Sequence, residues 1–170
     1  MMKIEKMIIY GEIRMCTCCI TGPKEIPLTE TTRIQAALEY EIDRAVKDGY
    51  TCFISGFARG VDLIFAEAVA ARIRSGLPLQ LVAALPSLTR LKMLENKPAA
   101  RALLMLCSEI YTVGENYSSG VYIKRNKYMV ERSQRVIAVY SRSNQGDSAL
   151  LIREARRRKL DLHIIPLETQ

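Results

Sequence analysis

The chain has 170 residues, of which 49% are hydrophobic and 25% are charged, and its formal net charge is +7. This length suits one domain with a full core, and the composition excludes a disordered protein. No apolar run approaches the ~20 residues that a membrane span needs, and residues 1–15 lack the apolar segment and cleavage site of a signal peptide. We therefore expect one cytoplasmic domain over residues 1–170, with residues 1–11 as an appendage and with no membrane partner.

Short β-rich apolar runs alternate with segments of helical spacing, a pattern typical of βαβ units. The apolar runs predict strands at residues 15–21, 51–55, 79–85, 109–113, 135–140 and 162–165. Helices are predicted from Thr32 to Gly49, from Gly60 to Gly76, and over residues 98–107, 121–133 and 147–159. Residues 87–97 fit either a loop or a broken helical turn. The alternation predicts an α/β domain with three layers and a Rossmann-like fold, in which a mostly parallel sheet of about six strands carries helices on both faces.

The first expected helix has a periodic apolar stripe. Its residues recur at close to helical spacing: Ile34, Leu38, Ile42 and Ala45. Thr32 is followed three residues later by Gln35, which fits a capping box and predicts that the helix opens there.

Three of the five cysteines, Cys16, Cys18 and Cys19, lie in the first expected strand. Their odd number and crowding indicate reduced, buried thiols rather than a disulfide scaffold. Zinc is the alternative, but Cys16 and Cys18 would face one side of a strand and Cys19 the other, so they would not converge on one ion. The single histidine, His163, is expected to be a strand residue with a satisfied ring, and no metal site is predicted.

The positive charge is concentrated in residues 121–160, which contain eleven Lys and Arg against three acids. A one-sided basic excess indicates an anionic partner, either a phosphate ligand or a nucleic acid. The run Arg156–Lys159 fits better as the end of a helix, where cations favour the negative end of the dipole.

Ligands of open parallel sheets bind at the carboxyl ends of strands, near the point where the topology reverses. After the first strand, Thr21, Gly22 and Lys24 offer a hydroxyl, close backbone approach and a cation, although Gly-Pro is also ordinary turn chemistry. After the second strand, the turn 55–62 (Ser-Gly-Phe-Ala-Arg-Gly-Val-Asp) leads into a helix N-terminus and predicts an anion site. Its Asp62 either favours the helix dipole or binds a ribose hydroxyl. Neither the G-x-G-x-x-G fingerprint nor a Walker lysine occurs there.

Two later segments extend this set. Arg125 and Asn126 offer planar hydrogen-bonding groups for a phosphate or a base. Residues 146–149 (Gly-Asp-Ser-Ala) form a small-residue turn into the last helix, in which Asp147 either opposes an anion or caps the helix.

Together these segments are similar to a known family. They are Ser55-Gly56-x-Ala58-x-Gly60-Val61-Asp62, Ala83-Ala84-Leu85-Pro86, Lys124-Arg125-Asn126-x-x-Met129-Val130 and Ala138-Val139-Tyr140. In this order they resemble the YpsA-like family of the SLOG superfamily, which is Rossmann-like and related to DNA-processing protein A and the Lonely Guy enzymes. The resemblance implies a pocket for a nucleotide or a derivative such as NAD or ADP-ribose, with no required cofactor. The residues expected to bind the ligand or its phosphate are Thr21, Gly22, Lys24, Ser55, Gly56, Gly60, Asp62, Pro86, Arg125, Asn126, Gly146, Ser148 and Ala149.

Some positions depart from the family's pattern. Pro23 and Lys24 stand where the family commonly has His-Arg, so a contact from that histidine is missing. Asp147 stands at the second position of the family's Gly-Gly-Thr-Ala turn, which predicts weaker or reshaped phosphate binding. No aromatic residue occurs in 87–93 after the third strand, and the Arg/Glu pair of the Lonely Guy enzymes is not found.

Three functions stay open. The leading hypothesis is a module that binds or senses a nucleotide-derived small molecule. The second is a nucleotide N-glycosidase, which needs a carboxylate beside the ribose, and Asp62 is the candidate for that role. The third is single-stranded nucleic-acid binding by residues 121–160, with Tyr117, Tyr122 and Tyr128 as stacking partners. The sequence does not say whether the chain forms homo-oligomers.

Overall fold

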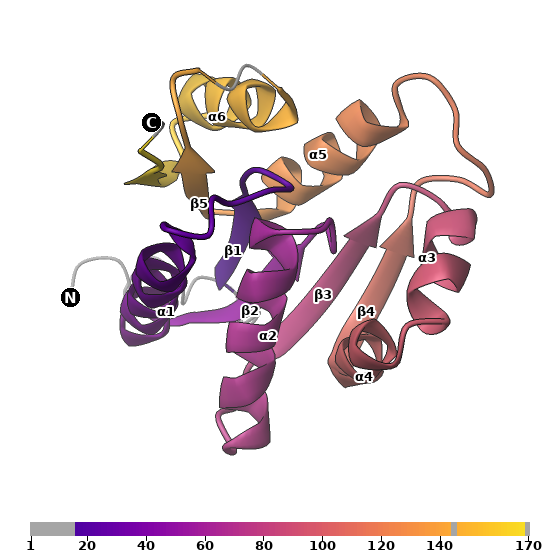
Figure 1. The fold of residues 1–170 in the computed structure, drawn as a ribbon, viewed down its shortest axis with the longest axis horizontal. Coiled ribbons are helices and arrows are strands. Elements are labelled where there is room, and N and C mark those ends of the chain that lie inside the picture. Colours follow the sequence, from indigo (N-terminus) through magenta and orange to yellow (C-terminus); the bar gives the residue numbers. More distant parts are fainter. Residues whose placement is uncertain (1–15, 144–145, 169–170) are drawn as a thin grey trace, which may run out of the picture.

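The computed structural model describes residues 16–143 and 146–168, so the expected appendage at residues 1–11 lies outside the described residues. The described residues form alternating strands and helices (Figure 1). The strands are β1 (Cys16–Thr21), β2 (Tyr50–Ser55), β3 (Gln80–Leu85), β4 (Cys107–Thr112), β5 (Arg135–Tyr140) and β6 (Asp161–Pro166). The helices are α1 (Thr31–Lys47), α2 (Val61–Arg74), α3 (Leu88–Glu95), α4 (Pro98–Leu106), α5 (Val121–Arg132) and α6 (Asp147–Arg157).

The six described strands form one parallel sheet in the order β4-β3-β2-β1-β5-β6. The chain first moves outward from β1 to β4 and then crosses back to place β5 on the other side of β1. The direction of winding therefore reverses between β1 and β5, whose carboxyl ends lie together because Thr21 pairs with Ala138. The expected Rossmann-like α/β fold is confirmed.

Helices cover both faces of this sheet, and each face has its own hydrophobic core (Figure 1). One core lies beneath α1, α2 and α4 and includes Phe53 and Ile137. The other lies beneath α5 and α6 and includes Ile54 and Val136. Successive residues of the central strands β2, β3 and β5 thus alternate between two buried layers, which explains why these strands are mostly apolar, whereas the outer strands β4 and β6 are largely not buried.

The cysteines of β1 follow the same alternation. Cys18 is buried in the first core with Cys16 packed against it, whereas Cys19 belongs to the second core. Burial raises the pKa of Cys19 to about 12 and that of Cys18 well above its usual value, so both are protonated thiols at neutral pH. Among the described residues, no group of three or more His, Cys, Asp or Glu side chains is arranged to hold a metal ion. In the same part of the chain no helix is long and apolar enough to cross a membrane.

The expected start of α1 is wrong. The helix begins at Thr31, its N-cap is Glu30, and no side-chain cap hydrogen bond is made, so Thr32 and Gln35 form no capping box. The apolar stripe predicted for this helix is buried as expected: Ile34, Leu38, Ile42 and Ala45.

The segment left open between a loop and a helical turn is a helix, α3. Ser87 caps it, because the Ser87 Oγ accepts a hydrogen bond from the Arg90 N–H at 3.1 Å. Of its residues only Leu94 is buried. This helix is short and buries little surface. Its sequence therefore has no regular spacing of apolar residues from which a helix could be predicted.

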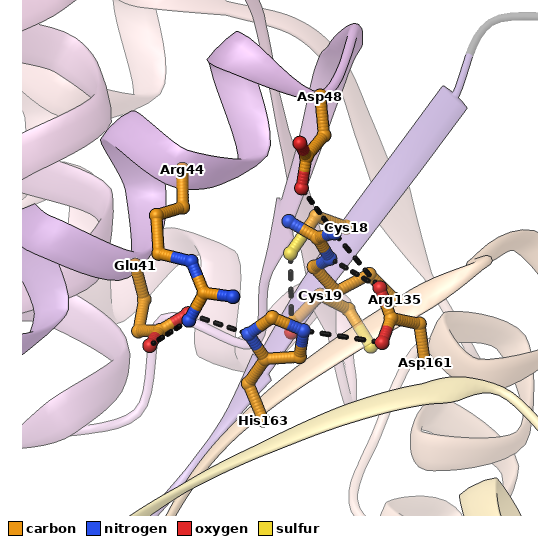
Figure 2. Close-up of polar contacts among 8 residues, drawn as sticks. All are labelled: Cys18, Cys19, Glu41, Arg44, Asp48, Arg135, Asp161 and His163. Atoms are coloured by element: carbon orange, nitrogen blue, oxygen red, sulfur yellow. Dashed lines mark hydrogen bonds and ion pairs between the residues drawn. The ribbon is translucent and has the colours of Figure 1, made fainter. Parts of the chain in front are cut away.

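An ionic network around the buried Arg135 lies at the amino-terminal ends of β5 and β6 (Figure 2). The Arg135 side chain, 4% exposed, donates from Nε to Asp161 at 2.8 Å and from Nη2 to Asp48 at 2.6 Å. Its guanidinium also lies 4.5 Å from the centre of the Tyr50 ring. The hydrogen bond from Arg135 lowers the pKa of Asp48. Burial would raise the pKa of Asp161, but the hydrogen bond and charge of Arg135 outweigh it and lower that pKa.

His163 joins this network to α1 (Figure 2). Its Nδ1 lies 2.6 Å from the Glu41 carboxylate and its Nε2 lies 3.1 Å from Asp161. Glu41 in turn accepts a hydrogen bond from Arg44. The expectation of a strand histidine with a satisfied ring is confirmed.

Candidate functional site

A cavity of about 480 Å³ opens between the carboxyl end of β1 and the start of α6, the helix that follows β5, where the winding direction reverses. We call it the first cavity. Its walls come from the turn after β1, the turn after β2, the inner face of α5 and the start of α6. Open α/β sheets bind their ligands at this kind of position, because the two neighbouring loops diverge and leave a crevice.

The turn after β1 packs closely on the start of α2. A Cβ on Gly22 would lie 2.6 Å from the Val61 side chain, so glycine is needed for this approach. The Val61 N–H donates to the Pro23 carbonyl at 3.2 Å. The first backbone donor of α2 is therefore occupied by the chain itself, contrary to the expectation that it faces an anion. Thr21 Oγ1 donates to Ser148 Oγ at 3.2 Å and ties β1 to α6.

The turn after β2 is also closed by internal hydrogen bonds. Ser55 Oγ donates to the Asp62 carbonyl at 2.8 Å and accepts the Phe57 N–H at 3.2 Å. The Ala58 N–H donates to Asp62 Oδ2 at 3.3 Å. Gly60 has a φ of +82°, and a Cβ there would lie 2.6 Å from the carbonyl oxygen of Pro23. Ser55 and Gly60 therefore shape the turn.

Two arginines from other elements hold the outer side of this turn. Phe57 adopts a left-handed backbone with φ of 51°, and its carbonyl accepts a hydrogen bond from Arg90 Nη2 at 3.1 Å. Arg125 Nη1 donates to the Gly56 carbonyl at 3.3 Å. A non-glycine residue with positive φ persists only where its surroundings hold it, and these bonds supply that support.

Arg125 and Asp62 form a buried charged pair beside the first cavity. Their side chains are 8% and 7% exposed, and Arg125 Nη1 lies 4.0 Å from Asp62 Oδ2. Burial raises the pKa of Asp62 to about 6, and the nearby positive charge of Arg125 opposes that rise. This separation exceeds a hydrogen-bond distance. The two groups therefore attract each other as charges, but the carboxylate accepts no hydrogen bond from the guanidinium. A Cβ on Gly56 would lie 2.1 Å from Arg125 Nη1, so Gly56 makes room for this arginine.

The start of α6 forms the remaining wall. Gly146 is the N-cap residue, and no side-chain cap hydrogen bond is made, so Asp147 does not cap the helix. Gly146, Asp147 and Ser148 all line the first cavity. The Asp147 carboxylate opposes an anion there, but it can accept hydrogen bonds from sugar hydroxyls.

A second cavity of about 460 Å³ adjoins the first, and Lys24, Ala58, Arg59 and Arg125 line both. It extends towards α3 and the loop before α5, where Tyr117 contributes to its wall. The two cavities together form a crevice along the carboxyl edge of the sheet. We call the shared residues the waist of this crevice.

Comparison with known proteins places the chain in a family. Residues 19–168 match the YpsA family, described as the YspA SLOG family. The chain belongs to this SLOG family. A comparison with curated proteins finds no significant match.

Two solved structures have the same fold as this SLOG chain. One is DNA processing protein A from Helicobacter pylori, described for its single-stranded DNA binding mode. Its TM-score is 0.64 at 19% identity, over 91% of this chain and 67% of that chain. The other is TM1055, a structural genomics target, with a TM-score of 0.55 at 16% identity, over 87% of this chain and 72% of that chain. At these identities the likeness establishes the fold alone.

In the SLOG chain most of the expected ligand residues converge. Those that line the first cavity are Thr21, Gly22, Lys24, Asp62, Arg125, Asn126, Gly146 and Ser148. Those that line the second are Lys24, Gly56, Pro86 and Arg125. Ser55, Gly60 and Ala149 are not among the lining residues of either cavity. That any of them binds a ligand stays a prediction.

The basic excess of residues 121–160 lies mostly elsewhere. Arg157 and Arg158 pair with Glu154 on α6, and Arg135 belongs to the network at the opposite edge of the sheet. Among the described residues of this range, Arg125 is the one basic residue that lines the first or second cavity. Lys127 also pairs with a carboxylate, that of Glu131. That the remaining cations of this stretch bind an anionic partner stays a prediction.

Sequence reasoning missed two cavity residues, Arg90 and Lys97, because it left residues 87–97 without a structure. Their position just after a strand end was the available signal. Tyr128 is the opposite case. It is buried, stacks on Tyr111 with ring centres 3.7 Å apart, and donates its hydroxyl to Glu109. It is not available to a nucleobase, whereas Tyr117 and Tyr122 line the second cavity.

Proposed function

We propose that this chain binds a nucleotide or a nucleotide derivative of the NAD or ADP-ribose kind, with the phosphate at the waist and a nucleoside in the first cavity. One observation carries the proposal. Arg125, a buried arginine, lines a cavity at the topological switch point and is held there by the Gly56 carbonyl. Membership of the SLOG family supports the same ligand class.

The charges of the crevice suit the two halves of such a ligand. Lys24 and Arg125 lie at the waist, and a guanidinium matches the geometry of a phosphate. Arg59, the other cation of the waist, is offset by Glu25 at 2.7 Å. The carboxylates of Asp62 and Asp147 lie in the first cavity, where they can accept hydrogen bonds from ribose hydroxyls.

Binding is favoured over catalysis. An N-glycosidase needs a carboxylate that stabilises positive charge developing on the ribose. The Asp62 carboxylate is buried and accepts the Ala58 N–H, so it holds the turn after β2 in place. Release of free base from AMP, lost in Asp62→Asn, would contradict this reading.

Thermal shift and calorimetry with adenosine, AMP, ADP-ribose and NAD test the proposal. We expect AMP to raise the melting temperature by several degrees and adenosine to raise it less, because a ligand stabilises the folded state by mass action. Lys24→Gln and Arg125→Gln are expected to weaken AMP binding about tenfold, the range of one charge-assisted contact. Lys127→Gln, on the exposed side of α5, is the matched control. Equal AMP affinity in all three variants, or no shift with any phosphate, would refute the proposal.

Single-stranded nucleic acid is a second candidate. The exposed ring of Tyr117 beside the cations of the crevice favours it, since bases stack on aromatic rings in such proteins. A labelled oligonucleotide should then bind with an affinity that falls steeply with salt. No shift of that oligonucleotide at low salt would remove this candidate.

A further inference from the structure

The second cavity differs from the first in its charge. The residues that line the first cavity include the acids Glu25, Asp62 and Asp147. Among the described residues, those lining the second cavity include five cations and no carboxylate: Lys24, Arg59, Arg90, Lys97 and Arg125. Glu25 offsets Arg59 and Asp62 partly offsets Arg125, so the excess positive charge of this cavity comes mainly from Lys24, Arg90 and Lys97, and such an excess attracts anions. Phosphate is the group that this half of the crevice suits.

Aromatic rings lie beside these cations. Tyr122 lies in the second cavity beside the waist, with Lys24 Nζ 5.3 Å and the Arg125 guanidinium 5.7 Å from its ring centre. Tyr117 lies next to it, with ring centres 6.0 Å apart, and its side chain is 72% exposed. The exposed ring of Tyr117, beside the cation-bound ring of Tyr122, offers a flat surface to a base, and stacking of this kind tolerates any base.

The size of each cavity limits what it can hold. Each is near the lower end of the ~300–1,000 Å³ that small-molecule pockets span, so each has room for about one nucleotide-sized unit. Because the two cavities share their waist residues, one ligand can enter both.

We propose that the second cavity is the subsite for a second nucleotide unit. The preferred ligand then carries two nucleotide units joined through phosphate, with the linking phosphate at the waist and the second base on Tyr117. This inference rests on the proposed function, and it names the length of the ligand. The linkage can be a pyrophosphate, as in NAD, or a phosphodiester, as in a short nucleic-acid strand.

Calorimetry on the full chain with AMP, ADP-ribose, NAD, the dinucleotide pApA and the octanucleotide (pA)8 tests the inference. We expect NAD or pApA to bind at least tenfold more tightly than AMP. Tyr117→Ala and Lys97→Ala are expected to bring the ratio of dinucleotide to AMP affinity close to one, because both side chains line the second cavity alone. Tyr40→Ala, an exposed tyrosine on α1, and Lys92→Ala, an exposed lysine on α3, are the matched controls and should keep the wild-type ratio.

The outcomes separate the inference from the proposed function. If AMP binds and neither dinucleotide binds more tightly, the second subsite is refuted and the proposed function stands. A dinucleotide gain that survives both Tyr117→Ala and Lys97→Ala refutes it as well. If AMP, ADP-ribose and NAD all fail to bind, the proposed function itself fails. A gain for NAD alone identifies a pyrophosphate ligand, whereas a gain for pApA that grows in (pA)8 identifies a strand.

Discussion

Arg125 and Arg135 are both buried, and they lie at opposite edges of the same sheet. Arg135, at the amino edge, has two carboxylates within 2.8 Å and a tyrosine ring beneath its guanidinium. Arg125, at the carboxyl edge, has its carboxylate 4.0 Å away and lines two cavities. Both residues are buried arginines, but Arg135 is hydrogen-bonded to carboxylates and Arg125 is not.

The difference separates a structural arginine from one that can serve a ligand. A guanidinium closed in by carboxylates within hydrogen-bond distance has its charge compensated by the fold itself. The Arg125 guanidinium is held by the Gly56 carbonyl, and its nearest carboxylate is beyond hydrogen-bond distance. It can therefore still bind an anion. Even Arg135 does not use all its hydrogen-bond donors, because among the described residues its Nη1 is buried without a hydrogen-bond partner.

The largest effect is expected at the amino edge. Arg135→Met should lower the free energy of unfolding by about 3 kcal/mol, because it removes two hydrogen bonds between charged groups, those to Asp48 and Asp161. Urea denaturation measures it, with Arg157→Met, which removes an exposed ion pair on α6, as a control expected to leave the urea midpoint nearly unchanged. Equal urea midpoints for Arg135→Met and Arg157→Met would show that the Arg135 network stabilises the fold no more than an exposed ion pair does. AMP affinity of the folded Arg135→Met protein should match that of the wild type.

A second substitution asks whether the carboxyl edge also supports the fold through its backbone. Gly60→Ala should cost about 2 kcal/mol, because φ is +82° and the new Cβ would meet two carbonyl oxygens at 2.6 Å. Gly76→Ala is the control, since its φ is +97° but nothing lies within 4 Å, and it should cost about 1 kcal/mol. If urea midpoints show the same loss for both, the close approach of the two turns contributes nothing.

Gly56→Ala should act mainly on the ligand. The added Cβ would lie 2.1 Å from Arg125 Nη1 and 2.6 Å from Asp62 Oδ2, so both buried side chains must shift. Displacement of this guanidinium should weaken AMP binding about tenfold, which corresponds to about 1.4 kcal/mol. Calorimetry and a urea titration on the same sample separate the two effects. Unchanged AMP affinity with a lowered urea midpoint would place Arg125 with Arg135, as a residue of the fold.

The smallest expected effect is a difference in pH dependence. Burial raises the pKa of Asp62 to about 6, so the folded protein holds this proton more tightly than the unfolded chain, whose carboxyl titrates near pH 4. Stability should therefore fall as pH rises from about 4 to about 6, by on the order of 1 kcal/mol relative to Asp62→Asn. Urea unfolding of both proteins at pH 4.5, 5.5 and 6.5 measures it. Parallel curves would show that Asp62 stays ionised throughout.

The carboxylates of the amino edge titrate with the opposite sign. The pKa values of Asp48 and Asp161 are lowered in the folded state, so their stabilisation is present above about pH 4 and is lost as the pH falls further. Arg135→Met should remove this loss of stability below about pH 4. It should leave unchanged the fall in stability between about pH 4 and about pH 6 that Asp62 causes.

Much of the fold could be predicted from sequence because it depends on local patterns. β5 has the predicted bounds, and the stripe of α1 is the predicted one, since a strand or helix must turn its apolar residues towards the core. α3 could not be predicted, because its single buried residue, Leu94, leaves no periodic trace. The cap of α1 was misplaced because a capping box specifies a pattern that several start positions can satisfy.

For the candidate site, the sequence alone determined which turns to consider, because short polar and glycine-rich segments after strands mark the edge where parallel sheets bind ligands. The tertiary structure decided which charges are available there. Local sequence places Arg125 on a helix and Arg135 at the start of a strand, but it does not show which carboxylates lie near either guanidinium. Only the strand order brings Asp48 and Asp161 to one and leaves the other 4.0 Å from Asp62 beside a cavity, because ion pairing depends on distances between residues far apart in the chain.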